Sequence, residues 1–306
     1  MLAGPVRREA SDSWRGAIVL GSHRSGTSAV TGVIEALGLP ACRDDDRYEM
    51  RPWSGHGLFE SKSLSLFDES LLGRLGGAWW APPLPPQRWA RKAEFKDLQV
   101  RAAFLFASAH PTQRWVWKDP RACVLMPFWD TILGADCPRI VVLRNPVECA
   151  ASLTKRNQMP REIGLAITER NLRTALRDSA GRAVWITAYE DLLSDTTGWC
   201  LNAGAFLKAN GLGLADPLPL EGAGAFVSDS MRHHREAESS LREAGARQGL
   251  HRLWSWAAER RGVHAALSTR GLPHESAETA PIIAAAMQSF IPVEDGRMRD
   301  SAPPEA

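Results

Sequence analysis

One short stretch near the amino end most constrains what this chain can fold into. Residues 21–28 read Gly-Ser-His-Arg-Ser-Gly-Thr-Ser, and they follow the apolar run at 17–20. In the next segment, apolar residues recur at the three- and four-residue spacing of a helix with one buried face: Val30, Val33, Ile34 and Leu37. The pattern predicts a buried strand, a glycine loop and a helix that begins at about Ser25, which is an α/β arrangement.

The predicted loop can bind a phosphate. The first turn of a helix has unpaired backbone N–H groups and a positive charge of about half a unit. Gly21 and Gly26 would let the backbone approach an anion closely, and Arg24 would add guanidinium donors. The other candidate binding residues of the loop are Ser22, His23, Ser25, Thr27 and Ser28. A tight strand-to-helix turn without a ligand is the alternative interpretation of the two glycines.

The loop differs at one position from the loop that binds ATP or GTP. It keeps both glycines of G-x-x-x-x-G-K-[ST], but Thr27 stands where that pattern has a lysine for the β and γ phosphates. The difference counts against a nucleoside triphosphate. We therefore predict a site for a 5′-phosphate.

Composition excludes several classes of protein. The 306 residues are 44% hydrophobic and 24% charged, which is typical of a globular chain, and a net charge of +2 is too small to imply nucleic acid or an acidic membrane surface as a partner. The five cysteines form no C-x-x-C pair, which favours a reducing compartment over disulfides or zinc. The first fifteen residues contain no apolar h-region, and no later apolar run reaches 18 residues. We expect a cytoplasmic protein without a membrane span.

The expected domain organisation is simple. We predict one domain over 15–291 with loop insertions at 40–57 and 76–90, between a flexible arm at 1–14 and a disordered tail at 292–306.

The second insertion is rich in tryptophan and proline. Residues 79–86 read Trp-Trp-Ala-Pro-Pro-Leu-Pro-Pro, which is a stiff and extended sequence. Trp79 and Trp80 could form a wall of an acceptor pocket, and a purely structural insertion is equally consistent with the sequence.

Two charged residues stand next to predicted elements. Glu60 precedes a segment with helical spacing at 64–75, where an acid often only complements the helix dipole. Lys118 ends a short apolar strand at 115–118, and ligands of open α/β sheets bind at the carboxyl ends of strands. A solvated strand end is the alternative interpretation of Lys118.

The clearest central strand is 139–143, with four consecutive aliphatic residues. Arg144 follows it directly, and Asn145 is predicted to cap the next helix. Arg144 and Ser152, two turns along that helix, could converge on a second anion. Alternatively, Arg144 pairs with Glu148, and Ser152 bonds back to its own helix.

The rest of the chain continues the α/β pattern less clearly. The spacing predicts helices at 160–180, 196–210 and 253–266 and a strand at 183–187. A basic patch at 231–235 could fold over a bound phosphate.

These motifs together resemble the sulfotransferase superfamily. Its members have strand-Gly-x-x-Arg-Ser-Gly-Thr-Ser-helix near the amino end, here 21–28, and strand-Arg-Asn-Pro-x-x-x-x-x-Ser more than a hundred residues later, here Arg144 with Ser152. The resemblance implies a P-loop-like three-layer sandwich, with a central, mostly parallel sheet between helices. It also implies 3′-phosphoadenosine 5′-phosphosulfate (PAPS) as the sulfuryl donor, bound by the first motif at its 5′-phosphosulfate and by the second at its 3′-phosphate.

The segment Trp117-Lys118-Asp119-Pro120 is similar to the Lys-Asp-Pro segment of one branch of that family, which includes protein-tyrosine sulfotransferases and many bacterial members. In that branch a glutamate between the loop and this segment is the general base, and Glu60 is the matching candidate. Cytosolic members use a histidine instead, but the corresponding interval here, 118–143, contains none. The family's carboxyl-terminal Arg-Lys-Gly segment has no clear match, and Arg232 is the candidate for its contact with the 3′-phosphate.

The resemblance implies an O-sulfotransferase that needs no metal. Glu60 would take the proton of a hydroxyl on a glycan or small-molecule acceptor, while Lys118 and Arg24 would stabilise the developing negative charge. Two other functions stay open. A P-loop kinase for a small metabolite would need a lysine and a Mg²⁺-binding acid near the loop, and a nucleotide-binding homologue would bind the donor without catalysis.

Overall fold

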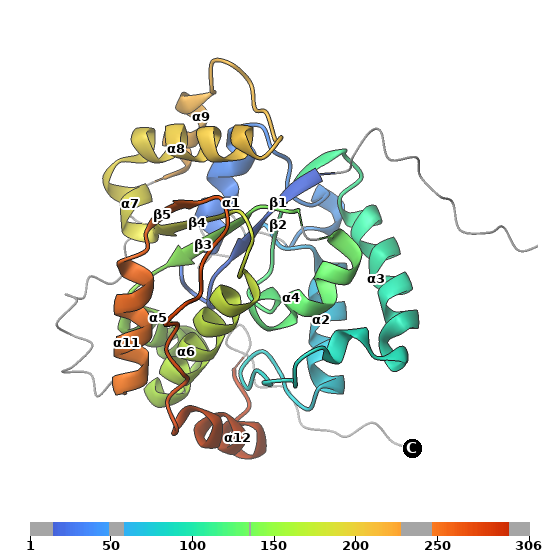
Figure 1. Ribbon diagram of the computed structural model, residues 1–306, viewed down its shortest axis with the longest axis vertical. Coiled ribbons are helices and arrows are strands. Elements are labelled where there is room, and N and C mark those ends of the chain that lie inside the picture. The colour runs from blue at the N-terminus through green and yellow to red at the C-terminus, as the bar shows by residue number, and fades with distance from the viewer. Residues whose placement is uncertain (1–14, 49–57, 135, 228–246, 294–306) are drawn as a thin grey trace, which may run out of the picture.

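The computed structural model describes residues 15–48, 58–134, 136–227 and 247–293, and its centre is a five-stranded sheet (Figure 1). The strands are β1 (Arg15–Leu20), β2 (Arg114–Lys118), β3 (Arg139–Leu143), β4 (Val184–Ala188) and β5 (Gly262–His264). Their order is β2-β1-β3-β4-β5. The first four strands are parallel, and β5 pairs antiparallel with β4. The predicted mostly parallel sheet is confirmed.

Helices cover both faces of this sheet (Figure 1). The longer ones are α1 (Thr27–Ala36), α2 (Lys62–Arg74), α3 (Lys96–Ala109), α4 (Ala122–Leu133), α5 (Pro146–Asn157), α6 (Arg161–Asp178), α8 (Thr196–Ala209), α11 (Gln248–Ala258) and α12 (Thr279–Ser289). Shorter ones are α7 (Tyr189–Ser194), α9 (Leu220–Phe226) and the 3₁₀ turns Asp44–Asp46, Trp89–Arg91 and Ala93–Phe95. The three-layer α/β sandwich is therefore confirmed.

The side chains of strand β1 show why helices must pack on both faces of the sheet. Ile18 and Leu20 point into a core formed with α2, α3, α4 and α6, while Ala17 and Val19 point into a second core formed with α1 and α8. Alternate residues of a strand face opposite sides, and all four side chains are fully buried. Burial of a large aliphatic side chain contributes about 1.5–3 kcal/mol, so this strand is stable only between two layers.

The strand order creates a crevice at the carboxyl edge of the sheet. From β1 the chain continues to β2 on one side, and from β3 it continues to β4 on the other side. Strands β1 and β3 are themselves neighbours, with Leu20 opposite Val141. Ligands of open α/β sheets bind where the connections of adjacent strands diverge in this way. The loops after β1 and β3 carry the two predicted anion-binding motifs.

Most predicted elements near this edge are confirmed. Asn145 caps α5, since its side chain accepts the N–H of Val147 at 2.9 Å. Helix α1 begins at Thr27 rather than at Ser25, because Gly26 adopts φ 92° and the helix starts only after it.

The carboxyl-terminal third differs more from the prediction. The helix expected at 253–266 is α11, which ends at Ala258, and the chain then forms β5. Helices α9 and α12 were not predicted. In the first insertion, only 40–48 is described, while 49–57, the arm at 1–14 and residues 294–306 lie outside the described residues. Within the described ranges, no helix combines the length and apolar character that crossing a membrane requires.

Candidate active site

The loop after β1 turns sharply before α1. Arg24 and Gly26 adopt positive φ values of 67° and 92°. A Cβ atom on Gly26 would lie 2.3 Å from the Tyr189 ring, so only glycine fits there. The first turn of α1 contains no acidic residue, and no side chain caps it. Its N–H groups and dipole are therefore available to an anion.

One hydroxyl in this loop independently indicates a ligand. Ser25 is 2% exposed, and its Oγ has no hydrogen-bond partner among the residues that the structure describes. A buried hydroxyl without a partner costs about 1–3 kcal/mol. Ser22 and Thr27 are also buried, and Ser22 Oγ lies 3.5 Å from Thr168 Oγ1.

The two anion-binding motifs meet in the crevice between β1 and β3. Arg24 Nε donates to Ser152 Oγ at 2.8 Å, and Arg144 Nη1 donates to the carbonyl oxygen of Arg24 at 3.0 Å. Arg144 also pairs with Glu148 at 2.9 Å and lies over the Tyr189 ring, 5.0 Å from its centroid. The pairing of Arg144 with Glu148 that the alternative interpretation expected is present, but Arg144 also contacts the loop after β1. Arg24, Arg144 and Ser152 form one cluster.

This cluster carries positive charge that its carboxylates do not balance. Among the described residues, Arg24 forms no ion pair. Burial, followed by the neighbouring guanidinium groups of Arg156 and Arg144, lowers the pKa of Arg24 to about 10. Arg156 was not predicted from the sequence, although it follows Ser152 by four residues on α5 and thus lies on the same face of that helix. A bound anion would relieve the repulsion.

His23 lies beside the same positive charges. Burial, and then the charges of Arg121, Arg156 and other nearby cations, lower the pKa of His23 well below its ordinary value. The imidazole is therefore neutral near pH 7. Its ring centroid lies 4.7 Å from that of Trp79, so the tryptophan insertion packs against the loop.

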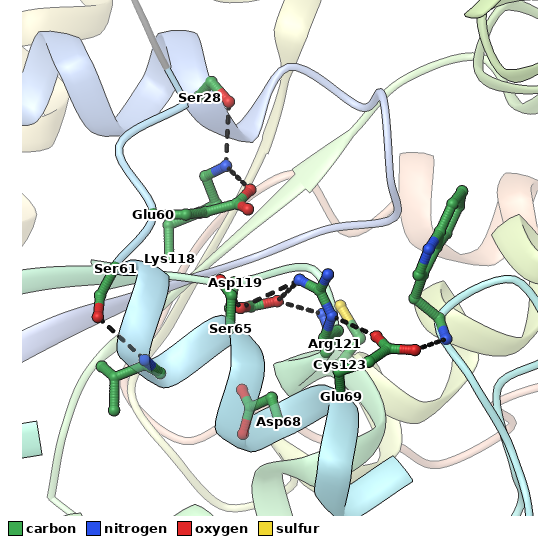
Figure 2. A network of polar contacts seen from close by, with 12 residues as sticks. Ser28, Glu60, Ser61, Ser65, Asp68, Glu69, Lys118, Asp119, Arg121 and Cys123 are labelled. Carbon is green, nitrogen blue, oxygen red and sulfur yellow. Dashed lines mark hydrogen bonds and ion pairs between the residues drawn. The ribbon is translucent and has the colours of Figure 1, made fainter. Parts of the chain in front are cut away.

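Glu60 and Lys118 form a second cluster beside the start of α1 (Figure 2). Lys118 Nζ donates to Ser28 Oγ at 3.0 Å and pairs with the carboxylate of Glu60. The side chain of Lys118 is 1% exposed, so the interpretation of a solvated strand end is wrong. Glu60 lies before the N-cap of α2, because Ser61 Oγ accepts the N–H of Leu64 at 3.1 Å. Glu60 is thus not a first-turn acid, and its carboxylate faces the site.

A separate network of polar contacts begins at Asp119, the residue after Lys118, and reaches the tryptophan insertion (Figure 2). Arg121 donates to Asp119 at 3.1 Å and to Glu69 at 2.9 Å. Glu69 also accepts the backbone N–H of Trp79 at 3.4 Å. Trp79 meets Trp80 edge-to-face, with 5.9 Å between the ring centroids. The end of β2 therefore positions the insertion against the loop.

The structure thus places most of the predicted site residues at one edge of the sheet. The cluster of Arg24, Arg144 and Ser152 follows β1 and β3, while Lys118 ends β2 and pairs with Glu60, which precedes α2. Arg232 lies outside the described residues. No group of three or more His, Cys, Asp or Glu side chains within the described ranges could hold a metal ion.

Two solved structures are similar to this chain over most of its length. One is the sulfotransferase domain from the Synechococcus PCC 7002 olefin synthase, with 18% identity, a TM-score of 0.40 and coverage of 92% of this chain and 98% of that chain. The other is the sulfotransferase domain from the curacin biosynthetic pathway, with 16% identity, a TM-score of 0.41 and coverage of 89% and 98%. No protein-family model matches the chain, and no curated protein matches it significantly. We therefore base the function on the contacts of the site's own side chains.

Proposed function

We propose that this protein is an O-sulfotransferase that transfers a sulfuryl group from PAPS to a hydroxyl of a glycan or small-molecule acceptor. One observation carries the proposal. Arg24 and Arg144 follow two neighbouring parallel strands; Arg144 donates to the Arg24 carbonyl oxygen, and Arg24 donates to Ser152 on the helix after Arg144. A ligand in this crevice would be held by positive charge from both junctions, which suits a nucleotide with phosphate groups at two positions.

The two parts of the crevice would bind different ends of the donor. The loop at 22–28, apart from the Arg24 side chain, and the first turn of α1 would receive the 5′-phosphosulfate, because they offer backbone N–H groups and the unpartnered hydroxyl of Ser25. Arg144, Ser152 and Arg24 would receive the 3′-phosphate. Arg24 is assigned to this end because its side chain contacts Ser152. Arg232 stays a candidate for the same phosphate.

Glu60 and Lys118 would carry the chemistry. The acceptor oxygen attacks the sulfur, the bond from sulfur to the bridging oxygen breaks, and adenosine 3′,5′-bisphosphate leaves with an additional negative charge. Glu60 would take the acceptor's proton, a contribution of about 10²–10⁴ in rate. The ammonium of Lys118 would stabilise the charge on the bridging oxygen. Because Lys118 pairs with Glu60 in the structure, we propose that the donor binds first and draws Lys118 away from the base.

The contact of Lys118 with Ser28 also separates this proposal from a kinase. The loop itself contains no lysine, and β2 supplies one from a distant part of the sequence. Ser28 occupies the position whose hydroxyl binds Mg²⁺ in the ATP and GTP loop. An ammonium beside that hydroxyl supplies positive charge where the kinase would hold its metal, so it favours sulfuryl transfer without a metal ion.

Transfer of labelled sulfate tests the proposal. The protein, incubated with ³⁵S-labelled PAPS and acceptor extracts, should release adenosine 3′,5′-bisphosphate and form a labelled product. Glu60→Gln should abolish transfer and leave bisphosphate binding intact, while Glu94→Gln, at an exposed glutamate, should keep full activity. Activity retained in Glu60→Gln would remove Glu60 from the mechanism.

Nucleotide binding separates the alternatives. In thermal unfolding, the bisphosphate should raise the unfolding midpoint, and ATP with Mg²⁺ should not. The reverse result would identify a kinase. Donor binding without transfer to any acceptor would identify a nucleotide-binding homologue.

We also propose that residues 15–291 form a single cytoplasmic domain. The location is supported by the cysteines, all five of which are free thiols.

A further inference from the structure

The outer face of α2 and α3 exposes large apolar side chains. Leu66 on α2 is 68% exposed, and Val100 and Phe104 on α3 are 73% and 76% exposed. The two helices lie side by side (Figure 1), and Val100 and Phe104 are one turn apart on the same face of α3. Single exposed apolar residues are ordinary on protein surfaces, but a group of them on adjacent helices indicates an interaction site.

A groove of about 270 Å³ runs between these helices. Its apolar lining comes from Leu66, Phe67, Leu71, Leu98 and Leu105. Its charged lining residues are Arg74 and Arg101, and no Asp or Glu among the described residues lines it. With Ser63 and Ser70 as its neutral polar positions, the groove is mostly apolar, and it is positive at its charged positions.

The dimensions of the groove suit a helix. The α2 side extends from Ser63 to Arg74, which at 1.5 Å per residue is about 16 Å, or three turns. An amphipathic helix of this length can insert apolar side chains at i, i+3 or i+4, and i+7 between two parallel ridges.

The charge pattern determines the partner. In a symmetric contact between two copies of this face, Arg74 and Arg101 would meet the same arginines, which like-charge repulsion disfavours. A helix with glutamate or aspartate beside its apolar face would pair with both. We infer that the groove between α2 and α3 is a docking site for an acidic amphipathic helix of another protein.

The groove and the candidate active site use opposite faces of α2. Ser65 and Glu69 of this helix bond to Asp119 and Arg121 in the site network, while Leu66 lines the groove. A docked partner would thus leave these contacts intact. It would lie on the helix that begins immediately after Glu60. This inference does not depend on the proposed chemistry.

Fluorescence anisotropy with a designed peptide tests the inference. The probe is a labelled 18-residue helix with leucine at i, i+3, i+4, i+7 and i+11 and glutamate beside that face. Its control carries lysine in place of every glutamate. The acidic peptide should bind, and the basic peptide should bind at least about tenfold more weakly.

Variants locate the binding surface. Leu66→Ser should weaken binding of the acidic peptide at least about tenfold, because one large apolar contact of the groove is lost. Arg74→Glu with Arg101→Glu should reverse the preference between the two peptides. Leu201→Ser, at a residue that is 52% exposed on α8, is the matched control and should change nothing.

Three results would overturn the inference: no binding of either peptide, equal binding of both, or equal loss in the Leu201 control. Sedimentation velocity adds a fourth. A concentration-dependent dimer that Leu66→Ser abolishes would make a second copy the occupant. All substituted side chains lie on the surface, and circular dichroism confirms that each variant is folded before its binding is measured.

Discussion

Replacement of Arg24 by Met should stabilise the protein in the absence of nucleotide while it weakens nucleotide binding. The reason is the depressed pKa of Arg24, about 10, which burial and the charges of Arg156 and Arg144 cause. One pKa unit corresponds to about 1.4 kcal/mol, so the charged guanidinium carries an unfavourable free energy of about 3 kcal/mol before solvent screening. Partial exposure reduces this to about 2 kcal/mol.

The variant also loses a favourable contact. The hydrogen bond from Arg24 to Ser152 contributes about 1 kcal/mol. The net expectation is a gain of about 1 kcal/mol in the free energy of unfolding, or about 2 °C in the unfolding midpoint of a chain of this size. Methionine keeps the length of the side chain and adopts the positive φ at this position no less readily than arginine.

Nucleotide should reverse the order of stability. At a bisphosphate concentration of about 100 times its dissociation constant, the wild-type protein gains about 2.7 kcal/mol. Without Arg24, binding should be about 10–150-fold weaker because a charge-assisted contact is lost. The variant would then gain less than about 1.5 kcal/mol. Differential scanning calorimetry with and without the bisphosphate measures all four midpoints.

Arg170→Met is the matched control. Arg170 is also a buried arginine, but Glu275 accepts from it at 2.8 and 2.6 Å. Removal of one partner from a buried pair costs about 3–5 kcal/mol, so this variant should lose stability. If Arg24→Met lost stability in the same way, Arg24 would be a structural residue, and the argument for an anion site would fail.

Three further predictions test other contacts. Lys118→Met should lower the free energy of unfolding, measured in urea, by about 3–5 kcal/mol, because Glu60 keeps a charge without its partner. The double variant with Glu60→Gln should recover most of this loss, and no recovery would contradict the ion pair. Burial, followed by the charge of Asp119, raises the pKa of Asp68 well above its ordinary value, so this carboxyl stays protonated in the folded state. The free energy of unfolding should therefore fall as pH rises above about 4, where the carboxyl ionises in the unfolded chain. Asp68→Asn should flatten this pH dependence, because the amide oxygen can still accept the indole N–H of Trp129 and does not titrate. Trp79→Ala should raise KM for the acceptor at least about tenfold in steady-state assays and leave the affinity for the bisphosphate unchanged. An unchanged KM would mean that Trp79 serves only in packing.

The sequence determined the parts of the site that depend on neighbouring residues. The apolar run, the glycines and the helical spacing at 17–37 predict β1, its loop and α1, because strand burial, left-handed turns and helix faces follow local rules. The same holds for β3, its Asn145 cap and α5. Arg24, Arg144 and Ser152 could therefore be identified before their contacts were seen.

Only the tertiary structure decided which side chains meet. Lys118 reaches Ser28 because β2 pairs with β1 in the register that places Lys118 opposite Val19, and no local pattern specifies this register. The pairing of Glu60 with Lys118 depends on it as well. Strand β5 escaped prediction for a related reason, since none of its three residues is buried and the strand is held by pairing with β4 rather than by an apolar pattern. The local spacing of residues determines whether a segment forms a helix or a strand, and the order of strands in the sheet determines which charged side chains lie close together.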